Sequence, residues 1–169
     1  MFKFIGAILV IVGCGGFGFR IALNYKKEEK SLRQLMAILD YMECELQYRL
    51  TPLPDLCRQI SKVFQGMPGK VFSELALEME AQISPNLFHC MTVTLGKNKY
   101  IPLITREELL LLGKSMGRFD LDGQIKGLEA VRQDCMRNLE ILSNNRECKL
   151  RSYQTLGLCA GAALAILLI

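Results

Sequence analysis

The charged residues of this chain are confined to its middle. The stretches Phe4–Phe19 and Ser152–Ile169 contain no Asp, Glu, Lys or Arg, and of all the charged residues only Lys3 lies outside the region between them. An apolar stretch of about 17–25 residues can cross a bilayer as a helix, and a helix is required there because lipid offers no partners to backbone polar groups. The expected division is a transmembrane helix at 1–23, one helical domain at 24–151 and a second transmembrane helix at 152–169.

Basic residues flank both apolar stretches on their inner sides. They are Arg20, Lys26, Lys27, Lys30 and Arg33 after the first stretch, and Arg146, Lys149 and Arg151 before the second. Lys and Arg near a membrane segment favour the cytoplasmic side, and the two flanks agree. The middle domain should therefore be cytoplasmic, at a cell membrane, with its basic residues near anionic lipid headgroups.

The middle region shows the periodicity of helices. Leu32, Leu35, Leu39, Met42 and Leu46 recur at spacings of three and four, which is typical of one helix face. That helix should end near Thr51-Pro52, because a residue before proline avoids the helical conformation. Further helices are expected at 54–64, at 70–83, from a Ser84-Pro85 start to about 95, at 107–116 after a Thr105–Glu108 capping box, and from about 121 onward with a buried stripe of Ile125, Leu128, Val131, Cys135, Leu139 and Leu142.

No segment has the alternating pattern of a strand. The expected fold is therefore all-α, a six-helix bundle whose long first and last helices continue into the N- and C-terminal transmembrane helices. Inside the second apolar stretch, Gly157 and Gly161 are four residues apart, a spacing that lets helix backbones approach closely. Gly18 and Ala22 form a weaker pair in the first stretch. Packing of the two segments within one chain, self-association into a homo-oligomer, and chance all remain open.

The residue types in the sequence do not indicate catalysis or metal binding. Seven cysteines occur without a C-x-x-C arrangement, and His89 is the only histidine, so a zinc site is not expected. The cysteines are expected to be free thiols in a reducing compartment. No phosphate-binding glycine loop follows a strand, and a net charge of +4 without a basic and aromatic motif does not indicate nucleic acid. We expect no enzyme activity, no cofactor and no metal.

A second interpretation begins from Ile11-Val12-Gly13-Cys14, which looks like the site where bacterial lipoproteins are cut and acylated. With Lys3 in front of it, the segment could be a short signal peptide. The chain would then be an exported lipoprotein, acylated at Cys14, with a helical binding domain. Against this, the apolar character continues beyond Cys14, where lipoproteins usually have a polar tether.

Several segments, in order along the chain, carry a resemblance to a known family. They are Gly6-Ala7-Ile8-Leu9 with Phe17-Gly18-Phe19, Leu32-Arg33-Gln34-Leu35, Glu45 with Thr51-Pro52-Leu53, Gly117-Arg118-Phe119-Asp120-Leu121 with Gln124, and Leu156-Gly157-Leu158. Together they resemble the stage III sporulation protein AB family of endospore-forming bacteria, and the resemblance covers essentially the whole chain.

The resemblance implies a scaffold component of the channel between mother cell and forespore, anchored in the mother-cell membrane. Its soluble domain would be similar to the cytoplasmic domain of the inner-membrane platform proteins of type II secretion and type IV pilus machines. The implied partners are a secretion-type ATPase, stage III sporulation protein AA, and the ring-forming proteins of the channel. The matched residues expected to contact partners are Arg118, Asp120, Gln124, Glu45 and Pro52. Each also has a structural interpretation, such as Asp120 as a helix cap or Pro52 as a helix stop.

Overall fold

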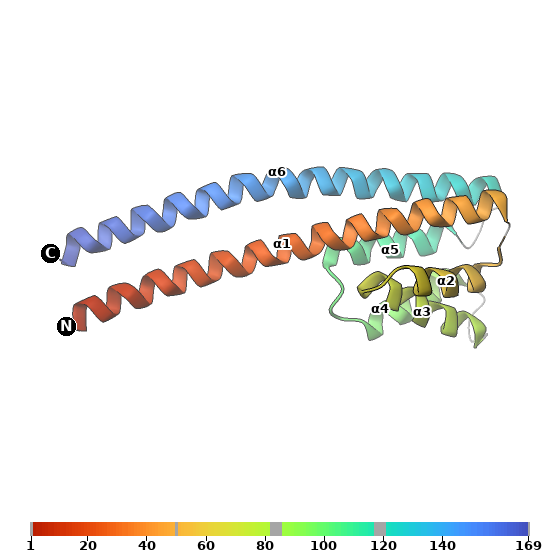
Figure 1. The fold of residues 1–169 in the computed structure, drawn as a ribbon, viewed down its shortest axis with the longest axis horizontal. Helices are drawn as coiled ribbons and strands as arrows, with labels where there is room; N and C mark the ends of the chain where they lie inside the picture. The colour runs from red at the N-terminus through yellow and green to blue at the C-terminus, as the bar shows by residue number, and fades with distance from the viewer. Residues whose placement is uncertain (1, 50, 82–85, 117–120, 169) are drawn as a thin grey trace. The chain divides into compact units, whose positions relative to one another are not determined.

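All regular structure that is described in the chain is helical (Figure 1). The computed structural model describes the backbone of residues 2–49, 51–81, 86–116 and 121–168, and the side chains of 23–49, 51–81, 86–116 and 121–144. Within these ranges there are six helices and no strand, which confirms the predicted all-α fold. The helices are α1 (Phe2–Tyr48), α2 (Leu53–Val63), α3 (Met67–Glu80), α4 (Leu87–Lys97), α5 (Leu103–Ser115) and α6 (Leu121–Leu168).

The chain divides into two compact units. Residues Glu28–Leu139 form one, called here the central unit, and Met1–Lys27 with Glu140–Ile169 form the other. Among the residues whose side chains the structure describes, no helix holds a stretch long and apolar enough to cross a membrane. The two predicted transmembrane segments lie outside those residues except for Leu23.

The expected packing glycines of the transmembrane segments belong to the same undescribed set. Gly18 lies in the helical backbone of α1, and Gly157 and Gly161 lie in that of α6, but their surroundings are outside the described residues. Their role therefore stays a prediction.

The buried stripe predicted on the first helix is confirmed. Its five residues, together with Ile38, are buried in the central unit, as are Leu128, Val131 and Cys135 of α6. Burying a side chain of this size stabilises the fold by about 1.5–3 kcal/mol. At the edge of this contact Asp40 of α1 pairs with Arg132 of α6 across 3.0 Å. The hydrophobic pattern alone therefore specified which face of α1 turns inward.

The last helix begins at Leu121 as expected, and the other boundaries between residues 48 and 115 are shifted by one to four residues. The second helix begins at Leu53 and buries Leu56, Cys57 and Ile60. Val63, which continues the spacing of Leu56 and Ile60 and would be expected on the same buried face, is 58% exposed. The reason is that α2 stops there, because Phe64 takes up an extended conformation with φ −103° and ψ 111°. Periodicity cannot place the last turn of a helix that a backbone change ends.

Two glycines allow the chain to turn tightly from α2 into α3. Gly66 has a φ of 102°, which lies in the left-handed region that favours glycine. A Cβ built on Gly69 would lie 1.8 Å from the backbone oxygen of Phe64. The helix therefore begins at Met67, in the gap between the helices expected at 54–64 and 70–83, with Pro68 in its first turn.

The predicted capping box at Thr105 and Glu108 is wrong. The helix begins earlier, at Leu103, and both residues are buried within it. The N-terminus of α5 is instead met by Glu28 of α1, whose Oε1 accepts a hydrogen bond from the Ile104 backbone N–H at 3.5 Å. Glu108 accepts one from Asn138 Nδ2 of α6 at 2.7 Å. Glu28 of α1 thus caps the N-terminus of α5, whereas the sequence pattern predicted a cap from within α5.

Within the central unit α6 runs antiparallel to α1 (Figure 1). Two ends of the unit can therefore be told apart by which helix termini lie there. Glu28 and the N-terminus of α5 lie at one end. The turn from α1 into α2 lies at the other end, together with the start of α6. The ion pair between Asp40 and Arg132 fixes this alignment, since the turn follows Asp40 and the start of α6 precedes Arg132 on antiparallel helices. The predicted partner-binding residues Glu45, Pro52 and Gln124 all belong to this second end.

Candidate partner-binding site

Glu45 holds the end of α1 to the turn that follows it. The residue is only 6% exposed, and its carboxylate has two partners. Thr51 Oγ1 donates a hydrogen bond to Oε2 at 3.1 Å, and Arg49 Nη1 lies 3.3 Å from Oε1. A buried carboxylate is costly unless it is paired in this way. Glu45 therefore acts as a clamp that fixes the path of the chain from α1 into α2.

Tyr41, one turn earlier on α1, fixes α2 against the same face. Its hydroxyl donates a hydrogen bond to Gln59 Oε1 at 3.2 Å, and its ring meets that of Phe64 edge-on with centroids 5.9 Å apart. Burial of the phenol, with the negative charge of Glu45 close by, raises the pKa of Tyr41 above its ordinary value. The hydroxyl accordingly remains a hydrogen-bond donor at neutral pH.

Pro52 marks the point where the chain turns into α2. It is exposed, and its φ of −56° and ψ of 140° place it just outside the helix. Its carbonyl accepts the first helical hydrogen bond, from the Leu56 N–H at 2.9 Å. Asp55 follows in the first turn, where a negative charge is favoured by the helix dipole. Pro52 therefore marks the start of α2, since α1 has already ended at Tyr48, and its exposed side chain leaves room for a partner.

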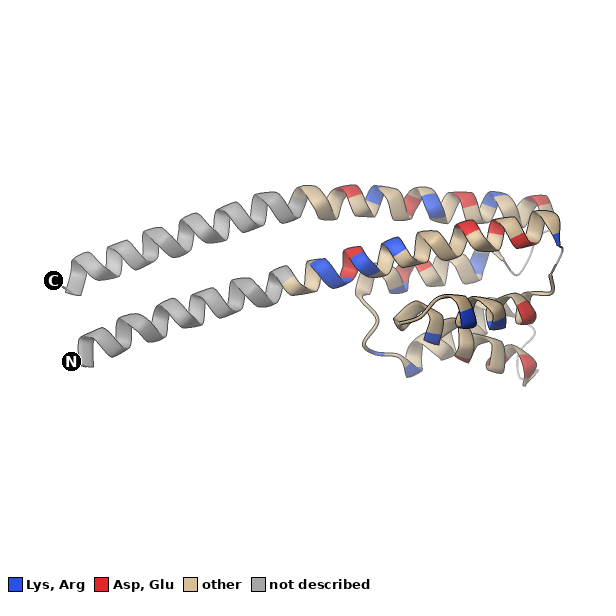
Figure 2. Cartoon of the chain, viewed as in Figure 1, with Lys and Arg blue, Asp and Glu red and all other residues tan. Residues whose placement is uncertain are grey.

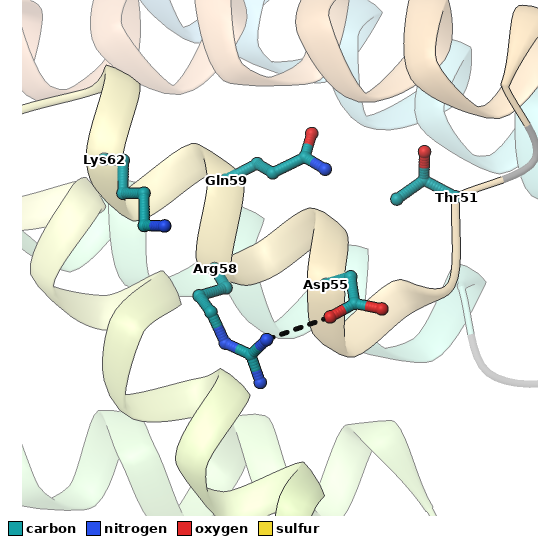
Figure 3. A pocket seen from close by; sticks show the side chains of 5 residues that line it. All are labelled: Thr51, Asp55, Arg58, Gln59 and Lys62. Atoms are coloured by element: carbon teal, nitrogen blue, oxygen red, sulfur yellow. Dashed lines mark hydrogen bonds and ion pairs between the residues drawn. The ribbon is translucent and has the colours of Figure 1, made fainter.

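A shallow, open pocket of about 280 Å³ lies beside this turn (Figure 3). Its lining consists of Thr51, Asp55, Arg58, Gln59 and Lys62. Asp55 Oδ1 lies 3.0 Å from Arg58 Nη1, and Arg58 also pairs with Glu80 of α3. The side chain of Gln59 extends toward Thr51, and that of Arg58 extends toward Asp55 (Figure 3). The pocket offers cationic and amide groups to a partner side chain but does not enclose a small molecule.

The structure brings some of the predicted partner-binding residues together and leaves others undescribed. Glu45 and Pro52 belong to one corner of the central unit, called here the α1–α2 corner. Gln124 lies in the first turns of α6 at the same end and is engaged in contacts of its own. Arg118 and Asp120 lie outside the described residues, so their part in this surface is a prediction.

Sequence reasoning missed the side chains that line the pocket. Asp55, Arg58, Gln59 and Lys62 are spaced by three, one and three residues along α2, on the face opposite Leu56 and Ile60. That spacing makes a polar stripe, and polar stripes are the ordinary solvated face of a helix. What distinguishes this stripe is its position against a clamped turn, which only the folded chain displays.

The described residues hold no group of three or more His, Cys, Asp or Glu side chains placed to bind a metal ion. His89 is exposed on α4, beside the buried Cys90. Cys57, Cys90 and Cys135 are buried free thiols, and Cys44 is an exposed one. Burial raises the pKa of Cys57 to about 12, which keeps that thiol protonated.

Fold and surface together define a class, an all-helical bundle that presents a charged corner to its surroundings. The comparisons with known proteins give the family. The family model described as "Stage III sporulation protein AB (spore_III_AB)" matches residues 3–169. The chain therefore belongs to the stage III sporulation protein AB family, as the resemblance in the sequence indicated.

One individual protein is similar in sequence, and one solved structure is similar in fold. The chain is 31% identical over 80 residues to stage III sporulation protein AB of Bacillus subtilis (strain 168). That match covers 47% of this chain and 47% of the relative, so it spans about half the length of the curated protein. A solved structure of a stage III sporulation protein AB shares the fold, with a TM-score of 0.64 and 20% identity, over 72% of this chain and 98% of that one.

Proposed function

We propose that this chain is a membrane-anchored structural component of the channel between mother cell and forespore, without chemistry of its own. In this proposal it sits in the mother-cell membrane and docks a secretion-type ATPase, stage III sporulation protein AA, and neighbouring channel subunits. Membership of a sporulation family supports the setting. The two uncharged apolar ends of the sequence support the anchoring, and the basic residues beside them support a cytoplasmic central unit.

The observation that carries the docking proposal is the α1–α2 corner. Buried Glu45 holds the turn through Thr51 and Arg49, so the adjoining side chains of α2 are presented on a fixed frame. Pre-organised surfaces bind better because less conformational freedom is lost on association. Arg58 is already paired with Asp55 and Glu80, whereas Lys62 takes part in no ion pair among the described residues. In the proposal the partner therefore offers a carboxylate to Lys62.

Charge reversal at the corner tests the docking. The full chain in lipid nanodiscs would be titrated with the purified ATPase, comparing the unaltered chain with Lys62→Glu. We expect the dissociation constant to rise by about tenfold, which corresponds to roughly 1.4 kcal/mol of lost binding. Lys70→Glu is the matched control, since Lys70 is an exposed lysine of α3 that does not line the pocket. Equal affinities for the two variants would contradict docking at the corner.

The side of the membrane can be tested with a cysteine that the chain already has. Cys44 is exposed on the central unit, so a membrane-impermeant maleimide reaches it wherever the unit faces the reagent. In protoplasts we expect Cys44 to stay unmodified until lysis, as judged by peptide mass spectrometry, with Cys44→Ser identifying the labelled peptide. Labelling before lysis would overturn the cytoplasmic placement and favour the exported lipoprotein acylated at Cys14, whose added acyl mass the same spectra would reveal.

The transmembrane glycines enter the same proposal. Gly157 and Gly161 would let α6 approach another helix closely, either the segment of α1 that contains Gly18 or a second copy of the chain. Cross-linking of the chain in membranes, with and without Gly161→Leu, separates these two cases. Loss of a dimer band points to a contact between chains, and an unchanged monomer that unfolds more readily points to a contact within one chain.

A further inference from the structure

The opposite end of the central unit carries a surface that the proposed docking does not use. We propose that the loop between α4 and α5 (Asn98–Pro102, called here the α4–α5 loop), with the first turn of α5, rests on the anionic headgroups of the bilayer. This inference relies on the membrane anchoring proposed above and adds the contact that orients the central unit. The occupant is a lipid surface that combines negative charge with an apolar boundary.

The first observation is the composition of this surface. Residues 96–106 contain Lys97, Lys99 and Arg106 and no acidic residue, and the loop shows blue without red in Figure 2. Tyr100 is 90% exposed and Leu103 is 66% exposed. Tyrosine is enriched where a membrane meets water, and a lysine can keep its charge among headgroups while its stem lies on apolar surface. Exposed Tyr, Leu and Lys side by side thus match the chemistry of that boundary.

The second observation is that the exposed side chains are held in place. Asn98 is buried, and its Nδ2 donates to the Thr94 carbonyl at 3.1 Å and to the Glu74 carboxylate of α3. Ile101 is buried as well, between the exposed Tyr100 and the half-buried Pro102. The loop is therefore anchored by two of its own residues. Tyr100 is therefore exposed because the folded loop holds it there, and not because the loop is unattached.

The third observation is where the loop is fastened. Glu28 of α1 accepts a hydrogen bond from the N–H of Ile104, so the first turn of α5 is held at the very start of the central unit. Glu28 comes only nine positions after Phe19, the last residue of the uncharged N-terminal stretch. Nine residues reach about 14 Å as a helix and about 32 Å when fully extended. The length of this connection therefore limits how far the first turn of α5 can lie from the residue where the apolar stretch ends.

The charges around the loop are consistent with an anionic surface. Three of the nearby carboxylates have partners within the chain. Glu28 faces the backbone N–H groups of α5, and Glu29 pairs with Arg33 across 3.0 Å. The third, Glu78 of α3, pairs with Lys97, and Glu107 is the exposed acid that follows. Lys99 takes part in no ion pair among the described residues, and Lys26, Lys27 and Lys30 add cations just before and after Glu28.

The absence of tryptophan from the sequence allows a direct test. Tyr100→Trp places one fluorophore on the loop of the full chain. Tyr48→Trp places one at a tyrosine that is 80% exposed, twenty residues after Glu28 on α1 and so about 30 Å away along the helix. Both variants would be reconstituted in vesicles of phosphatidylglycerol and phosphatidylcholine that carry a headgroup-attached spin label as quencher. Circular dichroism confirms that both retain their helix content.

We expect emission from position 100 to be quenched at least threefold more strongly than emission from position 48. Adding Lys99→Glu to Tyr100→Trp, or omitting phosphatidylglycerol, should reduce that difference. Equal quenching at the two positions in vesicles that carry the chain would overturn the inference while leaving the anchoring intact. Flotation of the vesicles measures the anchoring separately, and a chain that fails to float with them would remove both proposals. A difference that ignores lipid charge would overturn the anionic part.

Discussion

At the scale of single residues, three glutamate carboxylates connect different elements of the central unit. Glu28, Glu45 and Glu108 all reach from one element to another, to the N-terminus of α5, to the turn before α2 and to Asn138 of α6 respectively. None of these roles is visible in the local pattern, and the Thr105–Glu108 pattern pointed to the wrong one. A cap supplied from a distant helix leaves no signature near the helix that it caps.

Removing the Glu28 carboxylate should destabilise the chain measurably. We expect Glu28→Ala to lower the free energy of unfolding by about 1 kcal/mol, the usual effect of losing an N-cap. Glu29→Ala is the control, because it removes an exposed ion pair with Arg33 and should cost less than about 0.5 kcal/mol. Urea unfolding of the full chain in detergent measures both. Equal losses would show that Glu28 contributes only as an ordinary surface charge.

Glu108 makes the stability of the chain depend on pH. Burial raises its pKa above the ordinary value of 4.5, with Asp134 adding to the shift and the Asn138 hydrogen bond opposing it. A raised pKa means that the stabilising contribution of Glu108 is greatest below pH 4.5 and is lost as the pH rises through the raised value. Glu108→Gln is uncharged throughout, so its stability relative to the unaltered chain should increase from pH 4.5 to 8.

The measurement for Glu108 is urea unfolding at several pH values. Glu107→Gln is the control for the loss of one negative charge, because Glu107 is exposed in the same turn. A difference between Glu108→Gln and the unaltered chain that stays constant across the pH range would contradict the assignment to Glu108.

At the scale of elements, the number, type and order of the helices could be predicted from the sequence. The stripe of α1 was predicted correctly because five large apolar residues at helical spacing have one low-energy arrangement, facing the core. The ends of the helices could not be predicted as well. At Val63 and Gly66 a backbone change ends one helix and starts the next, and at Leu103 a carboxylate from α1 allows the helix to start early.

Close approach of helices at glycine is a further feature that periodicity misses. A Cβ on Gly127 of α6 would lie 2.6 Å from Ser115 Cβ of α5, whereas a Cβ on Gly96 would meet nothing within 4 Å. Gly127→Ala should therefore destabilise the chain by about 1 kcal/mol or more, because overpacking at about 1–3 kcal/mol exceeds the gain in helix propensity. Gly96→Ala should stabilise it by about 0.5–1 kcal/mol.

Thermal unfolding of the two glycine variants side by side provides the check. Replacing Ser115 by glycine in the Gly127→Ala background should recover part of the loss, since the conflict is between those two positions. No recovery would place the cost of the substitution somewhere other than the α5–α6 contact.

At the scale of the whole molecule, the candidate site was only partly predictable. The resemblance pointed to Glu45 and Pro52, and the structure shows both at one corner. The pocket residues of α2 were not predicted, because a polar stripe becomes a distinctive surface only when a neighbouring element is fixed against it. Similarly, the α4–α5 loop is unremarkable in sequence, and its meaning comes from its position beside Glu28.

Thiol chemistry gives a prediction for the folded molecule as a whole. Cys57 and Cys135 are buried, and burial raises the pKa of each to about 12, whereas Cys44 is exposed. At pH 8 a thiol reagent should modify Cys44 within minutes and leave Cys57 and Cys135 unmodified until urea unfolds the chain. Peptide mass spectrometry over time follows each site. Early modification of Cys135 would show that the α1–α6 core opens in the native state.

The straight course of α1 through the central unit has a mechanical consequence. From Glu28 to Tyr48 the helix is about 30 Å long, with the α5 attachment at its first residue and the clamped corner at its last turn. Such a rod works as a lever. A tilt of only about 10° around Glu28 displaces the far end by about 5 Å, close to the pitch of one helical turn. A small change in the angle of α1 at Glu28 would therefore move the α1–α2 corner far enough to make or break a contact there.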